Sequence, residues 1–151
     1  LSMSLGAGET TLLNLTTAYG MLVNGGKRIL PTLIDRIQDR AGKTVFKHDT
    51  RVCPDCQPDF WTDQSVPNVP DMRDVVTKSS SAFQMVSMLE GAVERGTGRR
   101  IKAVGKPLAG KTGTTNDALD TWFLGFSPDL VVGVFVGFDT PRSLQNEDEP
   151  S

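Results

Sequence analysis

The run from Gly110 to Asn116, Gly-Lys-Thr-Gly-Thr-Thr-Asn, holds the residues of this chain with the clearest chemical potential. Taken together with Gly105 upstream, it fits the pattern G-x-x-x-x-G-K-[ST], in which a lysine and backbone N–H groups hold the phosphates of a nucleotide. Taken alone, Lys111-Thr112-Gly113 matches the Lys-Thr-Gly element of serine acyl-transfer enzymes. The two interpretations require different local structures, so the surrounding elements must decide between them.

A phosphate loop must lead into a helix, because the N–H groups of the first helical turn point at the phosphates. Gly113 and the run 114–116 have poor helix propensity, and Pro107 lacks the N–H group that such a loop should present. The apolar run 131–138, followed by Asp139, resembles a strand that ends in a magnesium-binding carboxylate. However, the chain downstream of the lysine lacks the strand–helix alternation of a parallel sheet. The sequence therefore disfavours an NTPase.

The second interpretation places Lys111 on an exposed edge strand, where its ammonium group can attract a substrate carboxylate. Side chains alternate along a strand, so Lys111 and Gly113 share one face while Thr112 and Thr114 share the other. Gly113 lets a ligand lie against the backbone, and the strand edge can pair with an extended peptide. A twist or bulge is expected to bring the lysine and the Thr114 hydroxyl to one ligand. The structural alternative is an edge lysine that merely discourages aggregation.

Hydrophobic spacing predicts the elements around this run. They are helices over 11–24 and 81–95 and strands over 32–37, 43–46, 107–114, 120–126 and 130–138. A Ser81-x-x-Gln84 capping box is expected to open the second helix, and Gly96-Thr97-Gly98 to stop it and, secondarily, to wall a groove. Strand 130–138 is apolar enough to be buried on both faces. Helices with antiparallel strands make an α+β fold.

Residues 48–76 carry four prolines and both cysteines, which predicts a long loop pinned by Phe60 and Trp61. Cys53 and Cys56 form one C-x-x-C pair, for which a local disulfide, two free thiols and a metal site all stay open. The disulfide is favoured and requires an oxidising compartment. With the only histidine, His48, at most three soft ligands exist, whereas structural zinc takes four. Because the disulfide is favoured over the metal site, no metal is expected, and no cofactor is expected either.

Composition excludes several classes of function. The 151 residues carry 16 basic and 18 acidic side chains, a net charge of −2, so no single-sign field indicates nucleic-acid binding. No apolar run reaches the roughly 20 residues that span a bilayer. The chain begins without methionine or the layout of a signal peptide. We therefore expect a piece of a longer protein, with a polar tail over 146–151.

Three ordered blocks resemble the transpeptidase domain of bifunctional, class A penicillin-binding proteins. The first runs from Leu5 to Gly26 and includes Glu-Thr-Thr-Leu and Asn-Gly-Gly, the second from Met88 to Gly98, and the third from Gly105 to Phe126. The resemblance reaches to about Pro141. It implies that residues 1–145 form the C-terminal part of a partial transpeptidase fold of the serine β-lactamase and penicillin-binding-protein type, with an antiparallel sheet packed against helices.

The resemblance implies a peptidoglycan cross-linking enzyme whose serine attacks the penultimate D-alanine carbonyl of a stem peptide, and which β-lactams acylate. In that scheme Lys111, Thr112, Gly113 and Thr114 bind the substrate. Lys111 also shapes the field around the serine, and the Thr114 backbone N–H is an oxyanion-hole donor. The family further implies a parent protein anchored in the inner membrane, with a glycosyltransferase domain and with this domain in the periplasm.

Two motifs of that family are absent from the chain. No lysine follows a serine at three positions' distance, and no asparagine follows one at two, so Ser-x-x-Lys and Ser-x-Asn are missing. The nucleophile must then come from the upstream remainder of the same protein, and the isolated chain is expected to be inactive. The rival hypothesis is a non-catalytic, penicillin-binding-like module that only binds partners. Gly96-Thr97-Gly98 and the cysteine loop favour a cell-wall synthase over a β-lactamase.

Overall fold

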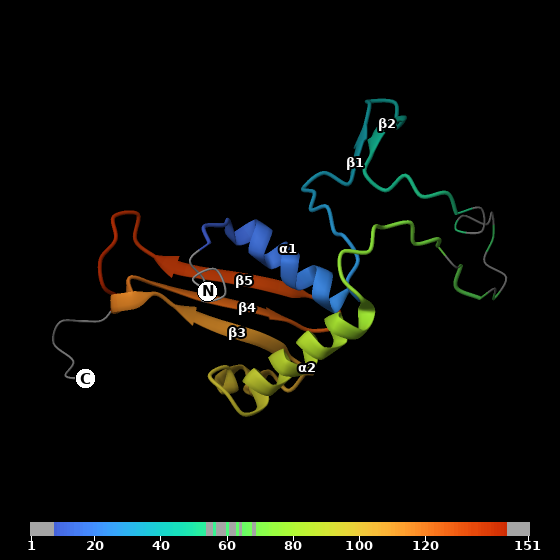
Figure 1. The fold of residues 1–151 in the computed structure, drawn as a ribbon. Coiled ribbons are helices and arrows are strands. Elements are labelled where there is room, and N and C mark those ends of the chain that lie inside the picture. Colours follow the sequence, from blue (N-terminus) through green and yellow to red (C-terminus); the bar gives the residue numbers. More distant parts are fainter. Residues whose placement is uncertain are drawn as a thin grey trace. The chain divides into compact units, whose positions relative to one another are not determined.

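The computed structural model describes residues 8–53, 56, 60, 63, 65–67 and 69–144 (Figure 1). The chain divides into two compact units. Unit 1 consists of residues 1–29 and 75–151 and contains both α-helices and the larger sheet. Unit 2 is the segment 30–74 between them and contains a two-stranded sheet. The Lys-Thr-Gly run therefore belongs to unit 1.

The two helices of unit 1 begin differently. Helix α1, Leu12–Val23, agrees with the prediction, and the Thr11 hydroxyl accepts from the Asn14 N–H at 3.1 Å. Helix α2 spans Ser79–Glu94 and has Lys78 at its N-cap, without a side-chain cap. The predicted Ser81-x-x-Gln84 capping box is thus wrong, because both of its residues lie inside the helix and the backbone turns helical two residues earlier.

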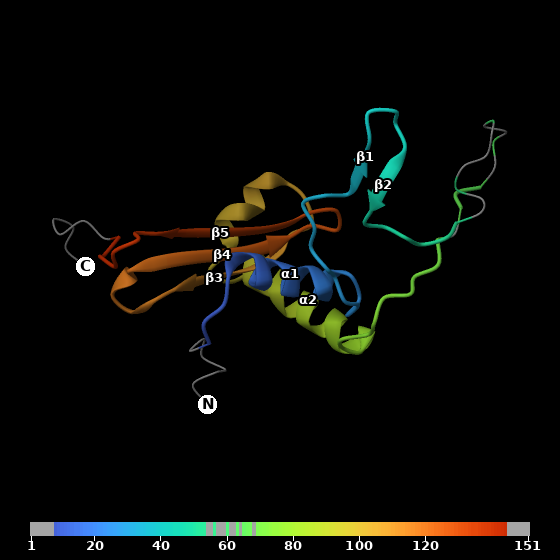
Figure 2. The same ribbon diagram turned by 90° about the horizontal axis from the view of Figure 1, so that it is seen from above.

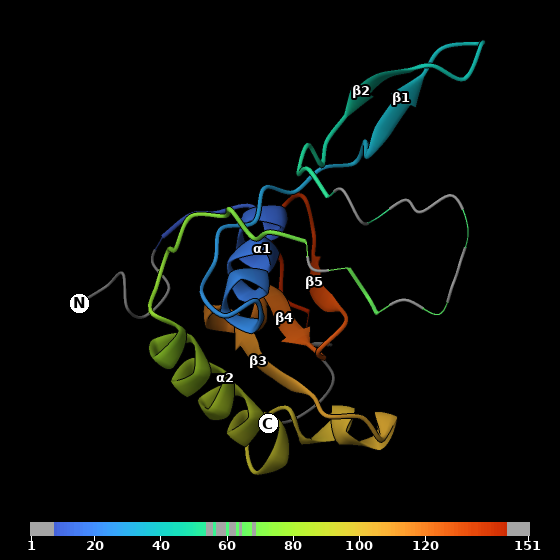
Figure 3. The ribbon, with the colours of Figure 1, turned by 90° about the vertical axis from the view of Figure 1, so that its right-hand side faces the viewer.

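The sheet of unit 1 is an antiparallel meander of β3 (Ala109–Thr114), β4 (Asp120–Phe126) and β5 (Val131–Gly137), in that order. A turn between β4 and β5 is closed by the Ser127 N–H, which donates to the Leu130 carbonyl at 2.8 Å. Helices α1 and α2 cover one face of this sheet (Figure 3). The strand bounds predicted from the sequence agree to within two residues.

The core of unit 1 lies between the helices and that one face. Leu89 of α2 packs against Ala109 and Phe126, which face each other across β3 and β4, and Tyr19 of α1 joins this cluster. On β5 the alternate residues point to the other face. These are Val132, Val134 and Val136, which are 40%, 42% and 49% exposed. The prediction that strand 130–138 is buried on both faces is therefore wrong for the residues described.

Unit 2 contains the antiparallel ribbon of β1 (Arg36–Gln38) and β2 (Thr44–Lys47) (Figure 2). The predicted turn at 39–42 is present, with the Gly42 N–H donating to the Asp39 carbonyl at 3.0 Å. The predicted first strand starts too early, because residues 32–34 form a local turn through the Thr32 hydroxyl. Phe60 is 81% exposed, so it does not pin the loop, and Trp61 lies outside the described residues.

Candidate functional site

The Lys-Thr-Gly run lies on β3, at one edge of the three-stranded sheet. Lys111 to Thr114 are all strand residues, and the helical residues that follow form one 3₁₀ turn, η4 (Asn116–Ala118). A phosphate loop needs a helix that begins at its lysine and threonine. The nucleotide-binding interpretation is therefore excluded by the backbone, and the edge-strand interpretation keeps its geometric basis.

Backbone hydrogen bonds fix which groups of β3 face the free edge. Just after β3, the Thr115 N–H donates to the carbonyl of Asp120, the first residue of β4, at 3.2 Å. Thr115 and Asp120 therefore form a hydrogen-bonded pair. Hydrogen-bonded and free pairs alternate along antiparallel strands. The N–H and C=O groups of Thr112 and Thr114 consequently point away from β4, toward the free edge. The Thr114 N–H can therefore donate to a ligand that lies along this edge.

The ammonium group of Lys111 lies at the same edge. Its Nζ donates to the Thr112 carbonyl oxygen at 2.7 Å, and this carbonyl points away from β4. The pairing of β3 with β4 runs unbroken from Ala109–Phe126 to Thr114–Thr121. The side chain of Lys111 reaches the edge by its own bending, so the ammonium needs no bulge to lie beside the free N–H groups.

The hydroxyls of Thr112 and Thr114 on β3 each lie within hydrogen-bond distance of the hydroxyl of another threonine. The Thr112 Oγ1 lies 2.8 Å from the Oγ1 of Thr97, and the Thr114 Oγ1 lies 3.2 Å from that of Thr121. Thr121 also donates to the Gly113 carbonyl at 3.4 Å. The sequence indicated Thr97 first as part of a helix stop and second as a groove wall, but it did not indicate the contact with Thr112.

The two glycines of β3 have different surroundings. A Cβ placed on Gly110 would lie 2.9 Å from the Phe123 Cζ, so glycine is required there by packing. A Cβ on Gly113 would meet only the Trp122 Cβ, at the ordinary distance of 3.6 Å. Gly113 therefore leaves an uncovered stretch of backbone against which an extended ligand can lie.

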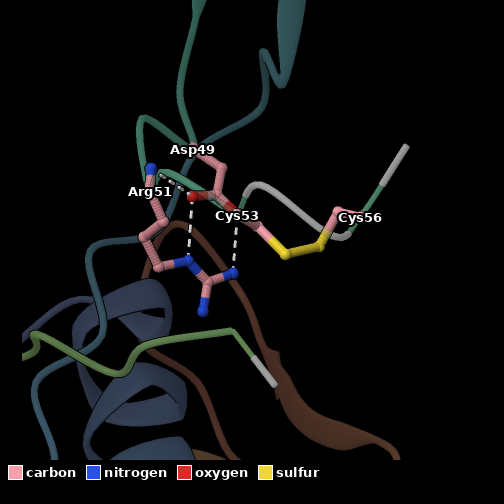
Figure 4. Close-up of a disulfide and its surroundings, with 4 residues drawn as sticks. All are labelled: Asp49, Arg51, Cys53 and Cys56. Carbon is pink, nitrogen blue, oxygen red and sulfur yellow. Dashed lines mark hydrogen bonds and ion pairs between the residues drawn. A yellow bond between two sulfur atoms is a disulfide. The ribbon is translucent and has the colours of Figure 1, made fainter. Parts of the chain in front are cut away.

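Unit 2 holds the cysteine pair. Cys53 and Cys56 are joined by a disulfide (Figure 4). Beside them Arg51 donates from Nε to the Asp49 Oδ1 at 2.9 Å, and this bond holds the pKa of the Asp49 carboxyl well below its usual range. Among the described residues, no three His, Cys, Asp or Glu side chains are grouped to hold a metal ion. Within the same residues, neither helix has the length and apolar character to cross a membrane.

The whole chain is similar to known proteins of one family. The family described as the penicillin binding protein transpeptidase domain matches residues 1–148. Penicillin-binding protein 1A of Rickettsia bellii (strain RML369-C) is 48% identical over 145 residues, and that of Neisseria gonorrhoeae is 41% identical over 145 residues. Each match covers 95% of this chain, but only 18% and 16% of the respective relative. The chain thus spans less than a fifth of these relatives.

Solved structures agree with the family match. A crystal structure of penicillin-binding protein 1A from Haemophilus influenzae superposes on 97% of this chain with a TM-score of 0.75 and 30% identity, and 25% of that chain is covered. The D,D-transpeptidase domain of a peptidoglycan glycosyltransferase from Eggerthella lenta shares the fold, with a TM-score of 0.61 over 83% of this chain and 27% of its own, at 24% identity. The predicted α+β transpeptidase-type fold is confirmed.

Proposed function

Because this chain belongs to the penicillin-binding protein transpeptidase family, we propose that it forms the C-terminal part of a peptidoglycan D,D-transpeptidase. In this proposal residues 1–145 belong to the transpeptidase domain and 146–151 form a tail. The serine nucleophile lies in the upstream remainder of the same protein, since Ser-x-x-Lys is absent here. As the resemblance to class A penicillin-binding proteins implies, we further propose that the parent protein carries both a glycosyltransferase and a transpeptidase domain.

One observation carries the proposal. The ammonium of Lys111 and the backbone N–H of Thr114 lie at one free strand edge, next to the bare backbone of Gly113. An ammonium group attracts a carboxylate, and a free strand edge binds an extended peptide through main-chain hydrogen bonds. A stem peptide ending in D-alanyl-D-alanine has both features, and a β-lactam with its carboxylate resembles that end.

The proposed roles follow from these positions. Lys111 and the hydroxyls of Thr112 and Thr114 bind the terminal carboxylate, and Lys111 also biases the field around the incoming serine. The Thr114 N–H stabilises the oxyanion of the tetrahedral intermediate, together with the N–H of that serine. One such donor contributes about 3–4 kcal/mol to transition-state stabilisation.

The disulfide between Cys53 and Cys56 supports an extracytoplasmic location, because disulfides persist in oxidising compartments. We place this region in the periplasm. Another part of the protein anchors it in the inner membrane.

The test is acylation of the full-length protein by a labelled penicillin. Lys111→Ala should lower the second-order rate constant of acylation by about 10- to 150-fold, the range for loss of a hydrogen bond to a charged group. Lys43→Ala, an exposed lysine between β1 and β2, is the matched control and should label like the wild type. The isolated chain should not be labelled. Undiminished acylation of Lys111→Ala would remove the role given to Lys111.

The absence of Ser-x-x-Lys from this chain also fits a non-catalytic module that only binds partners. The same experiment separates the two proposals. A non-catalytic module predicts that the full-length wild-type protein forms no covalent adduct, whereas a transpeptidase predicts one adduct on a serine outside these 151 residues.

A further inference from the structure

We propose that Thr97 is a positioning residue of the carboxylate site and that its hydroxyl orients the hydroxyl of Thr112. This inference rests on the proposed function and adds a residue from outside the Lys-Thr-Gly strand. Thr97 follows α2, fifteen residues before Thr112, and the two Oγ1 atoms lie 2.8 Å apart. That distance is a normal hydrogen bond between hydroxyl groups.

The chemistry of the ligand decides the direction of this hydrogen bond. Each threonine hydroxyl has one hydrogen to donate and lone pairs to accept with. An ionised carboxylate only accepts, so Thr112 must direct its hydrogen to the ligand. The hydrogen between the two threonines must then come from Thr97. The result is a chain in which Thr97 donates to Thr112 and Thr112 donates to the carboxylate, and each bond polarises the next.

The backbone around Thr97 is held against α2. The N–H groups of Gly96 and Gly98 both donate to the Ala92 carbonyl, at 3.1 and 3.0 Å. A Cβ on Gly96 would lie 2.9 Å from that carbonyl oxygen and one on Gly98 3.3 Å from it, so the close return requires small residues. Leu89 in turn packs α2 against Ala109 of β3. The position of Thr97 is therefore fixed by the end of α2, which packs against the sheet.

Thr114 has a different arrangement behind it. Its neighbour Thr121 lies 3.2 Å away, but Thr121 also lies 3.4 Å from the Gly113 carbonyl, which competes for its single hydrogen. Thr121 can therefore donate its hydrogen to the Gly113 carbonyl and not to the Thr114 hydroxyl, so it orients Thr114 less firmly than Thr97 orients Thr112. The structure favours Thr97 as the residue that orders one hydroxyl of the site.

The test compares two ligands that differ only in the carboxylate: benzylpenicillin and its methyl ester. Acyl-enzyme formation on the full-length protein is followed by intact-protein mass. With the free acid, Thr97→Val should lower the second-order rate constant about 3- to 10-fold, as expected for loss of one hydrogen bond. Thr97→Ser should keep the wild-type rate. With the ester, whatever its absolute rate, Thr97→Val and the wild type should differ by less than twofold.

A double-mutant cycle separates the coupling between Thr97 and Thr112 from the independent effect of each substitution. In a Thr112→Val background, Thr97→Val should cause no further loss with the free acid, because the oriented hydroxyl is already gone. Thr44→Val, an exposed threonine at the start of β2, is the matched control and should leave the rate unchanged. Thermal midpoints of all variants show whether each is folded.

Three results would overturn the inference. Equal losses with the acid and the ester would show that Thr97 acts only on the fold. An undiminished effect of Thr97→Val in the Thr112→Val background would show that the two residues act independently. A Thr97→Ser variant as slow as Thr97→Val would show that the hydroxyl is not the active group. Absence of any wild-type acyl-enzyme is a separate result, which rejects the proposed transpeptidase itself and this inference with it.

Discussion

The side chain of Lys111 brings a positive charge to the free edge of β3, where the backbone offers only N–H and C=O groups. The residue faces the helix-covered side of β3, opposite Leu124, yet its ammonium lies at the free edge. Four flexible methylene groups make this possible, and arginine, with its planar fork, would present its charge differently. In the proposed site the ammonium can exchange the Thr112 carbonyl for a ligand carboxylate without any change of strand register.

Tyr19 gives a prediction at the same scale. It is the only tyrosine of the chain, and its ring centroid lies 6.4 Å from that of Phe126. Burial raises the pKa of its phenol above the ordinary 10.0, because the phenolate loses hydration. Since the folded pKa exceeds the unfolded one, this residue's contribution to stability is complete below the unfolded pKa. It is lost as the pH rises through the folded pKa.

An ultraviolet titration of phenolate absorbance on the purified chain checks this expectation. The folded chain should titrate at a higher pH than the chain in denaturant. Tyr19→Phe should remove the signal, which makes it the control for other absorbing groups. Coincident curves for the folded and denatured chain would contradict the burial of Tyr19.

At the scale of elements, the contact between α1 and β5 depends on Gly133. A Cβ at this position would overlap the Thr16 Oγ1 and lie 3.0 Å from the Leu12 Cδ1. Gly133→Val should therefore destabilise the protein by about 1–3 kcal/mol, the usual range for overpacking a core. Gly113→Ala is the matched control for stability, because its nearest contact would be 3.6 Å.

Urea unfolding of both variants measures the two free energies. The Gly133→Val midpoint should fall clearly below that of Gly113→Ala. Equal midpoints would mean that α1 can move away from β5 at little cost.

Elements were predictable to different degrees. Strand 120–126 is observed with the expected bounds, because its apolar run is followed directly by a clear turn. The start of α2 was not predicted correctly, because the helix begins at Ser79 and places Ser81 and Gln84 inside it. The first strand of unit 2 was shortened by a side-chain bond of Thr32 to its own backbone neighbour, a competition that hydrophobic pattern does not reveal.

At the scale of the whole molecule, the residues of unit 1 on either side of the segment 30–74 are paired with each other. Lys27 pairs with Val75 in an antiparallel bridge, and the Val76 and Thr77 N–H groups donate to the Gly26 carbonyl at 2.8 and 3.1 Å. Replacing residues 30–74 with a short glycine–serine linker should therefore leave unit 1 folded, because loop closure is already achieved.

Penicillin acylation of the full-length deletion variant and its thermal midpoint measure this. Labelling should persist within a few-fold of the wild type. Adding Gly26→Ala to the deletion variant should weaken its labelling by penicillin, because Gly26 has a φ of 85° and a Cβ there would overlap the Thr77 carbonyl. Loss of labelling in the simple deletion would show that unit 2 is part of the transpeptidase structure.

The sequence alone determined the chemical groups of the candidate site and their local form. Residue types and spacing made Lys111 to Thr114 a strand, because glycine and threonines cannot open a stable helix there. Tertiary structure decided which backbone groups face the free edge, that only one face of β5 is covered, and that Thr97 meets Thr112. Those features depend on hydrogen bonds and packing between residues far apart in the chain, which no local pattern encodes.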